Sequence, residues 1–252
     1  MLKQFVAAAV MLATAFLQAG EPAKPVNVLF LGDSLADFDR GSNHVDKLQA
    51  KLDVKWPGKV KLHNFAIRGD YIERMMDRMG GKKKTYALPR YKGIWDNQYD
   101  WALVALGHND TRARKDTNFT VPNMSDKQLR DGFSALIALL KSKGVKRIVL
   151  LSAASCNFEG ISKKTAKRLA AIKAGKMKDT PFAQFGDPKL LEAYNAIMKE
   201  FADADDAVEY LDIYTGMKAQ SDKASLFRAD GVHLSPKGHD YVAAAEFDYL
   251  TK

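Results

Sequence analysis

The chain has 252 residues, of which 46% are hydrophobic and 27% charged, a balance that excludes intrinsically disordered and fibrous proteins. The 39 Lys and Arg residues exceed the 30 Asp and Glu residues. The resulting net charge of +9 suits a negatively charged partner such as nucleic acid, acidic polysaccharide or a membrane surface. The single cysteine, Cys156, excludes an intramolecular disulfide.

The amino terminus has the pattern of a secretory signal peptide. Lys3 precedes an uncharged apolar run at positions 5–17, and the small residues Ala19 and Gly20 follow that run. The run is too short for a typical membrane-spanning helix, and no cysteine follows it that could carry a lipid. We therefore predict that residues 1–20 are a cleaved signal peptide. The mature chain would then have no membrane anchor, and the protein would be secreted or periplasmic.

The rest of the chain alternates between strand and helix patterns. Short runs rich in β-branched and aromatic residues predict five strands, at 26–31, 60–65, 101–106, 147–152 and 207–211. Three helices stand out: one begins after Ser125, which can form a capping box with Gln128; one spans about 189–204; and one runs from Ser235-Pro236 to Tyr249. This alternation indicates an α/β fold with a parallel sheet. No linker divides residues 21–252, which we expect to form a single domain.

Two connections are longer than is usual in a compact α/β domain, and we expect them to be functional insertions. They lie near 79–99 and 157–188. Between Glu159 and Asp179 the second contains seven Lys or Arg residues against two acidic ones, a local charge of +5. More than half of the net charge of the chain therefore lies in this segment.

A serine follows the first predicted strand directly, in the run Gly32-Asp33-Ser34-Leu35. Ligands of open α/β sheets bind at the carboxyl ends of the strands, so Ser34 is placed where a substrate would lie. A serine must lose its proton to a base before it can attack an ester. Because the run is also ordinary turn chemistry, its assignment as a nucleophile depends on finding that base.

A candidate base precedes the last predicted helix. Asp230 and His233 are three residues apart, a spacing that can bring the carboxylate to Nδ1 of the imidazole and leave Nε2 free to take the serine proton. Taken alone, this pair could equally be a turn with a surface histidine.

Two further strand ends supply hydrogen-bond donors. Gly69 follows the second predicted strand, and Asn109 follows the third. A glycine N–H and an asparagine amide, together with the N–H of Ser34, are the donor types that an oxyanion hole uses. Turn propensity explains each motif separately, but not the position of all of them at strand ends or just before the last helix.

Together the motifs resemble the four sequence blocks of the GDSL, or SGNH, hydrolase superfamily. The matching residues are Gly32-Asp33-Ser34-Leu35, Gly69, Gly107-His108-Asn109-Asp110 and Asp230-Gly231-Val232-His233. The resemblance implies a flavodoxin-like three-layer α/β/α sandwich with a five-stranded parallel sheet. It further implies that Ser34, Asp230 and His233 are catalytic, that Ser34, Gly69 and Asn109 form the oxyanion hole, and that no metal or other cofactor is required.

The third block is similar to rhamnogalacturonan acetylesterase and related secreted carbohydrate acetylesterases. This makes His108, and Arg112 just beyond it, candidate substrate-binding residues, with solvent exposure as the alternative for Arg112. We predict a secreted esterase that removes O-acetyl groups from a carbohydrate, neutral or acidic, and that does not bind nucleic acid. The alternatives are a lysophospholipase or thioesterase of the same superfamily, and a noncatalytic module that binds anionic glycan.

The charged second insertion leads to one further hypothesis. If it lies near Ser34, its excess of positive charge would attract an anionic glycan toward the active site. The alternative is that these basic side chains lie on a solvent-exposed helix face and have no role in binding.

Overall fold

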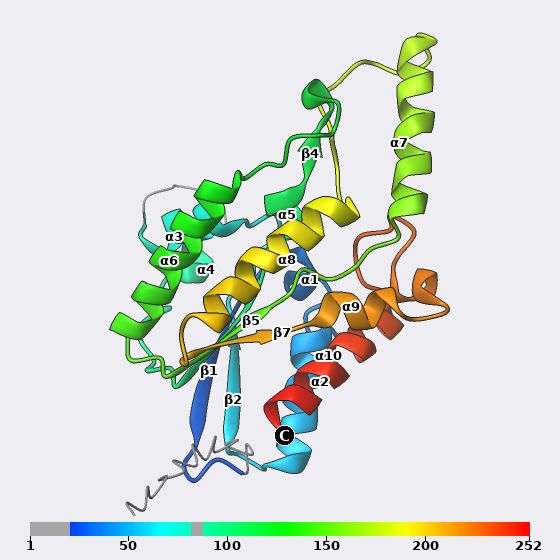
Figure 1. Cartoon of the computed structure of the whole chain (residues 1–252). Helices are drawn as coiled ribbons and strands as arrows, with labels where there is room; N and C mark the ends of the chain where they lie inside the picture. The colour runs from blue at the N-terminus through cyan, green and yellow to red at the C-terminus, as the bar shows by residue number, and fades with distance from the viewer. Residues whose placement is uncertain (1–20, 82–87) are drawn as a thin grey trace, which may run out of the picture.

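The computed structural model describes residues 21–81 and 88–252 (Figure 1). The predicted signal peptide at 1–20, and positions 82–87 of the first predicted insertion, lie outside the described residues. No helix in the described ranges is long and apolar enough to cross a membrane.

Five parallel strands form the central sheet, in the order β2-β1-β3-β5-β7. They are β1 (Val26–Gly32), β2 (Val60–Asn64), β3 (Trp101–Ala105), β5 (Arg147–Leu151) and β7 (Val208–Leu211), each within one residue of its predicted bounds. Because β1 lies between β2 and β3, the crossovers to either side of it run in opposite directions. Such a reversal leaves a crevice at the carboxyl ends of the strands, which is where ligands bind in open α/β sheets.

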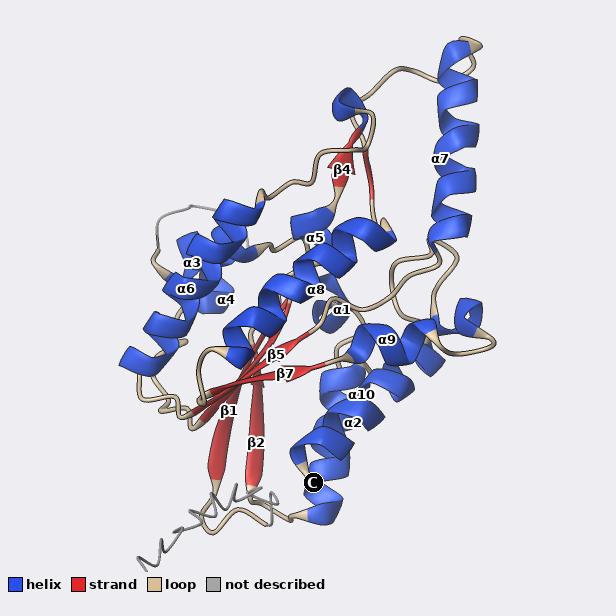
Figure 2. Ribbon diagram, in the orientation of Figure 1, coloured by secondary structure: helices blue, strands red, loops and turns tan. Residues whose placement is uncertain are grey.

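Helices cover both faces of the sheet (Figure 2). One layer contains α2 (His44–Lys55), α9 (Ile213–Lys218) and α10 (Pro236–Leu250); the other contains α3 (Ile72–Met79), α6 (Asp126–Ser142) and α8 (Pro188–Asp203). Alternate residues of β1 point to opposite layers, as the pleat of a strand requires. Val28 and Phe30 pack in the core beneath the first layer, and Leu29 and Leu31 pack beneath the second. The arrangement confirms the predicted three-layer α/β/α fold.

The predicted helix starts agree with the hydrogen bonds at each cap. The backbone N–H of Ser125 donates to the side chain of Gln128, and the N–H of Gln128 donates back to the hydroxyl of Ser125, so the predicted capping box is present. The hydroxyl of Ser235 accepts from the N–H of Gly238 at the start of α10. The carboxylate of Asp187 accepts from the N–H of Lys189 and caps α8, which begins at Pro188, one residue before the predicted range.

The second insertion folds into a projecting arm. It contains α7 (Phe158–Lys173) and β6 (Ala183–Gln184), and β6 pairs antiparallel with β4 (Ala113–Arg114). Figure 1 shows α7 and the β4–β6 pair extending beyond the sheet. Of the 16 residues of α7, only Ile161 is buried. We call α7, β4 and β6 the arm.

The remaining helical segments are short. They are α1 (Ser34–Asp37), α4 (Leu88–Tyr91), α5 (His108–Thr111), and the 3₁₀ turns Lys115–Thr117 and Lys223–Leu226.

Candidate active site

Ser34 lies at the carboxyl edge of the sheet, immediately after β1. Asp33 caps α1, because its carboxylate accepts from the backbone N–H of Leu35 at 3.0 Å. Ser34 is the first residue of that helix, and an N–H in the first turn of a helix has no intrahelical acceptor. The N–H of Ser34 is therefore available to a ligand at this edge. Ser34 also lines the cavity there.

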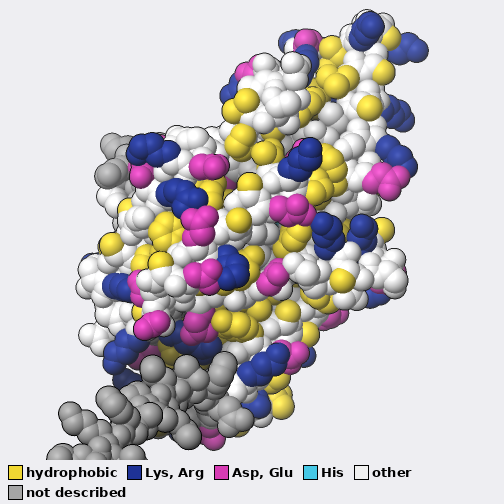
Figure 3. Space-filling view, viewed as in Figure 1, with side chains coloured by type: hydrophobic (Ala, Val, Ile, Leu, Met, Phe, Trp, Pro, Cys, Tyr) yellow, Lys and Arg dark blue, Asp and Glu magenta, His cyan; other side chains and the backbone are white. Residues whose placement is uncertain are grey.

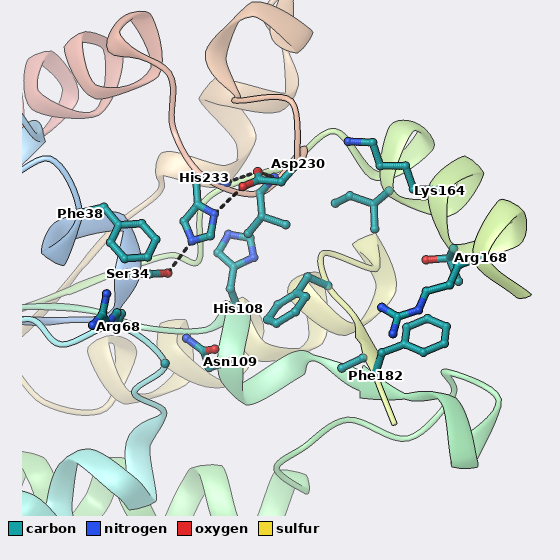
Figure 4. Close-up of a pocket in the computed structure, with 16 residues that line it drawn as sticks. Ser34, Phe38, Arg68, His108, Asn109, Lys164, Arg168, Phe182, Asp230 and His233 are labelled. Atoms are coloured by element: carbon teal, nitrogen blue, oxygen red, sulfur yellow. Dashed lines mark hydrogen bonds and ion pairs between the residues drawn. The ribbon is translucent and has the colours of Figure 1, made fainter. Parts of the chain in front are cut away.

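His233 and Asp230 complete a hydrogen-bonded chain with Ser34 (Figure 4). Nε2 of His233 lies 3.0 Å from Oγ of Ser34, and Nδ1 lies 2.7 Å from Oδ2 of Asp230. The other carboxylate oxygen of Asp230 accepts from the backbone N–H groups of Val232 and His233, at 2.8 and 2.9 Å. Burial raises the pKa of Asp230, but the hydrogen bonds from His233 and from the backbone outweigh it and leave that pKa below its usual value. An ionised Asp230 holds the proton of the imidazole on Nδ1 and leaves Nε2 as the acceptor.

The loop that carries His233 is fixed by its backbone. Phe227 and Leu234 form an isolated β-bridge, and the N–H of Arg228 donates to the carbonyl of His233 at 2.7 Å. On the other side of the imidazole, the ring of Phe38 packs against it with the centroids 4.8 Å apart. The imidazole of His233 is thus held between the ring of Phe38 and a loop that is fixed by backbone hydrogen bonds.

Asn109 and Gly69 lie at the ends of the two strands that flank β1. Asn109 follows Gly107, whose φ of +135° is open to glycine and strained for other residues. The amide Nδ2 of Asn109 donates to Oδ2 of Asp33 at 3.1 Å, which leaves the second N–H of that amide for the cavity. Gly69, with φ of +79°, lines the same cavity. Burial is the main reason that the pKa of Asp33 rises to about 6. Because this raised pKa is still below neutral pH, the carboxylate is mainly ionised there and can accept from Asn109.

The five residues that the sequence predicts as the catalytic set and oxyanion hole all line one cavity of about 520 Å³. This volume is typical of small-molecule sites. A serine hydroxyl paired with an oriented imidazole can attack a carbonyl carbon, and nearby N–H donors can stabilise the negative oxygen that results. The geometry therefore suits acyl transfer.

The two predicted substrate-binding residues differ in position. His108 lines the cavity, is 3% exposed, and forms no hydrogen bond through either ring nitrogen. Burial, and to a smaller extent the nearby His233, lower the pKa of His108 to about 4, so its ring is neutral near pH 7. Arg112 is half-buried near Arg74 and, among the described residues, does not belong to the cavity lining. Closeness in sequence to Asn109 therefore does not bring Arg112 into the cavity lining.

The basic residues that do line the cavity are Arg68, Lys164 and Arg168. The sequence places Lys164 and Arg168 in a charged segment, but it does not select them from their neighbours, and it does not indicate Arg68. The available signal is the spacing of Ile161, Lys164 and Arg168, which puts all three on one face of a helix. Among the described residues, no group of three or more His, Cys, Asp or Glu side chains could hold a metal ion.

This fold and this site are those of a carboxylic ester hydrolase. The chain belongs to the GDSL-like Lipase/Acylhydrolase family, which matches residues 30–241. No curated protein matches the chain.

Solved structures of similar fold come from distantly related proteins. A lipase/acylhydrolase from Enterococcus faecalis is 14% identical, with a TM-score of 0.60, and the match covers 90% of this chain and 95% of that one. A catalytic mutant of an acetylxylan esterase from Geobacillus stearothermophilus is 18% identical, with a TM-score of 0.62, and the match covers 94% and 97% of the two chains. At these identities the likeness establishes the fold.

Proposed function

We propose that the protein is an esterase that removes O-acetyl groups from a carbohydrate, with Ser34 as nucleophile, His233 as general base and Asp230 as the residue that orients His233. The observation that carries the proposal is the hydrogen-bonded chain Ser34–His233–Asp230 at the wall of the cavity, with Asn109 and Gly69 beside it.

The reaction proceeds by two acyl transfers. His233 takes the proton of Ser34 as Oγ attacks the ester carbonyl, and the N–H groups of Ser34, Gly69 and Asn109 receive the negative oxygen of the tetrahedral intermediate. His233 then gives the proton to the leaving alcohol, and Ser34 retains the acyl group. A water molecule deprotonated by His233 attacks that acyl group and restores the hydroxyl of Ser34.

The lining of the cavity supports a carbohydrate as the alcohol part of the substrate. Aromatic rings at Phe38, Phe182 and Phe185 stand among polar and basic side chains, a mixture that offers a sugar both apolar surface and hydrogen-bonding groups. The similar fold of an acetylxylan esterase supports the same substrate class.

A substrate panel tests the proposal. Acetate release from acetylated polysaccharides would be measured beside hydrolysis of p-nitrophenyl esters from acetate to palmitate, and of phospholipids, for the wild type and Ser34→Ala. We expect activity on acetylated carbohydrate and on short esters, abolished by Ser34→Ala. A preference for long acyl chains or for phospholipids would refute the substrate, and activity that survives Ser34→Ala would refute the mechanism.

We propose in addition that the protein is exported. The amino-terminal pattern of Lys3, the apolar run at 5–17 and the small residues after it supports this. Expression of the full chain in a bacterial host, cell fractionation and amino-terminal sequencing would test it. We expect a periplasmic or secreted product that begins at Gly20 or Glu21, and a cytoplasmic product that keeps Met1 or Leu2 would refute it.

A further inference from the structure

The cavity carries an excess of positive charge. Three of its lining residues are basic, namely Arg68, Lys164 and Arg168. Among the described residues of the lining, the one carboxylate is that of Asp230, and it already bonds to His233. Of these, Lys164 and Arg168 are the candidates for binding an anion, because no carboxylate of the described lining bonds to either of them.

Two of these cations belong to the same face of α7. Lys164 and Arg168 are four residues apart, which places them one helical turn apart on one side of the helix. Figure 4 shows both side chains along the α7 wall of the cavity, with Arg168 beside Phe182. The adjacent Lys163 is absent from the lining, and it pairs with Glu159 at 2.6 Å.

The contacts of Arg168 hold its guanidinium in place without neutralising it. Nη2 of Arg168 donates to the hydroxyl of Thr180 at 3.1 Å, and the guanidinium lies 4.0 Å from the centroid of the Phe182 ring. Its Nε is buried and has no hydrogen-bond partner. A buried donor without an acceptor costs free energy, and a charged guanidinium binds a carboxylate more strongly than a neutral donor does. Arg168 is therefore preorganised to receive an anion.

Lys164 is also bonded without a counter-charge. Its Nζ donates to the backbone carbonyl of Ala229, the residue before Asp230. In the described part of the chain, neither Lys164 nor Arg168 forms a salt bridge. Three acidic side chains in or next to the arm are paired with other cations: Glu159 bonds to Lys163, Asp116 to Arg114, and Asp179 to Lys115.

The bond from Lys164 to Ala229 also shows which part of a substrate would face α7. It ties α7 to the loop of Asp230 and His233, and Figure 4 shows Asn109 on the opposite side of the cavity from Lys164 and Arg168. The carbonyl oxygen of a bound ester points toward the oxyanion donors, whereas the leaving oxygen must lie beside His233 to receive its proton. The alcohol part of the ester therefore extends toward α7.

We propose that Arg168 and Lys164 form a subsite for a carboxylate on the alcohol part of the substrate, so that the preferred substrate is an acetylated glycan that contains uronic acid. This inference rests on the proposed esterase function and adds the charge of the glycan to it. The ring of Phe182 packs against the guanidinium of Arg168. Lys163, which is paired with Glu159, is not part of the subsite.

Matched substrates and matched variants test the subsite. Acetate release would be measured from acetylated oligogalacturonides and from the same oligosaccharides after methyl esterification of their carboxylates, with p-nitrophenyl acetate as a substrate that has no glycan. The variants are Arg168→Gln, Lys164→Gln and the control Lys163→Gln, each of which removes one positive charge from α7. Loss of one charged hydrogen bond predicts that Arg168→Gln lowers kcat/KM on the free-carboxylate substrate about 10- to 100-fold, mainly through KM. Lys164→Gln should lower it by a smaller factor, because Lys164 is an exposed residue and Arg168 is half-buried.

The outcomes separate this inference from the proposed function. We expect no change for Lys163→Gln on any substrate. For Lys164→Gln and Arg168→Gln, kcat/KM on each glycan is compared with kcat/KM on p-nitrophenyl acetate, so that an effect on folding or on the loop of His233 is separated from a loss of glycan binding. Equal losses on the free and methylated glycans, or an equal loss in Lys163→Gln, would overturn the subsite and leave the esterase function intact. If the wild type releases no acetate from any glycan, including neutral acetylated xylo-oligosaccharides, the proposed function itself fails.

Discussion

The bond between Asp33 and Asn109 sets the direction of the Asn109 amide. An asparagine amide can be rotated so that its oxygen and nitrogen exchange places, and only one of these orientations presents an N–H to an oxyanion. In the observed orientation Nδ2 of Asn109 donates to Oδ2 of Asp33 at 3.1 Å. An ionised carboxylate accepts hydrogen bonds and cannot donate them, so it selects this orientation.

The substitution Asp33→Asn should reverse that selection. The new amide can still accept from the N–H of Leu35 and cap α1, because asparagine is as good an N-cap as aspartate. While its oxygen accepts from Leu35, however, its NH₂ group faces Asn109, where it opposes the NH₂ of Asn109 and favours rotation of the Asn109 amide so that the Asn109 oxygen accepts from it. The cavity then receives the oxygen of the Asn109 amide in place of its N–H.

The expected loss follows from the oxyanion hole. Removal of one oxyanion donor lowers kcat by about 10² to 10³. We therefore expect Asn109→Ala to lower kcat on p-nitrophenyl acetate by that factor with little change in KM, and Asp33→Asn to lower it at least as much. In the double variant the two losses should not add, because Asp33 acts through Asn109.

A matched control separates orientation from general damage to the core. Glu246 is another fully buried carboxylate, bonded to Nδ1 of His44 at 3.1 Å between α2 and α10. Glu246→Gln makes the same chemical change outside the lining of the active-site cavity, and it should lower stability without lowering kcat. Losses for Asp33→Asn and Asn109→Ala that multiply in the double variant would refute the reasoning, as would wild-type kcat in a folded Asp33→Asn protein.

Three further outcomes follow from the packing. Gly107→Ala should destabilise the fold by about 3 kcal/mol or more in urea unfolding, because an added Cβ would lie 2.4 Å from a neighbouring side chain. The control Gly144→Ala is also at positive φ but has open space around it, so it should cost about 1 kcal/mol. The thiol of Cys156 is buried and its pKa is raised to about 12, so it should react with a thiol reagent at pH 8 only after unfolding; rapid reaction of the native protein would contradict its packing. Burial lowers the pKa of His239 from 6.5 to about 4. As the pH drops, His239 therefore takes up a proton in the unfolded chain before it does so in the folded protein. The free energy of unfolding should accordingly fall between about pH 6.5 and pH 4. His239→Asn, whose side-chain oxygen can still accept from the N–H of His44, should make stability less dependent on pH in that window, and an unchanged slope would show that His239 is not the group responsible.

The central sheet was predictable because its strands are covered on both faces. A strand such as β5, Arg147–Leu151, buries all but its first residue and reads as a continuous run of Ile, Val and Leu. The catalytic candidates were predictable for a related reason. Ser34 and Asn109 come directly after such strands, and parallel strands bring their carboxyl ends to one edge of the sheet.

The sequence could not reveal contacts that depend on how distant segments are placed. Asp33 and Asn109 are 76 residues apart, and their bond requires the register that pairs Gly32 with Ala105. The sequence did not reveal that α7 lines the cavity, for a different reason. Because Ile161 is its one buried residue, the helix lacks the apolar stripe by which amphipathic helices are recognised, and it could be predicted only as a charged insertion.

The weak burial of α7 bears on how the protein selects its substrate. The groups around Ser34 are fixed by the sheet and by the hydrogen bonds that link them, so substitutions among them alter the chemistry. Lys164 and Arg168 instead lie on a helix that contributes one residue to the core and presents Lys and Arg side chains to solvent (Figure 3). Lys164 is exposed, and exchanging an exposed side chain changes stability by about 0.5 kcal/mol or less, whereas Arg168 is half-buried against Phe182 and its exchange should cost more stability. Residues on α7 can therefore vary with little effect on the hydrogen bond between Ser34 and His233. Lys164→Gln should share the unfolding midpoint of Lys163→Gln, Arg168→Gln should unfold slightly earlier, and both should differ from Lys163→Gln in the glycans they accept.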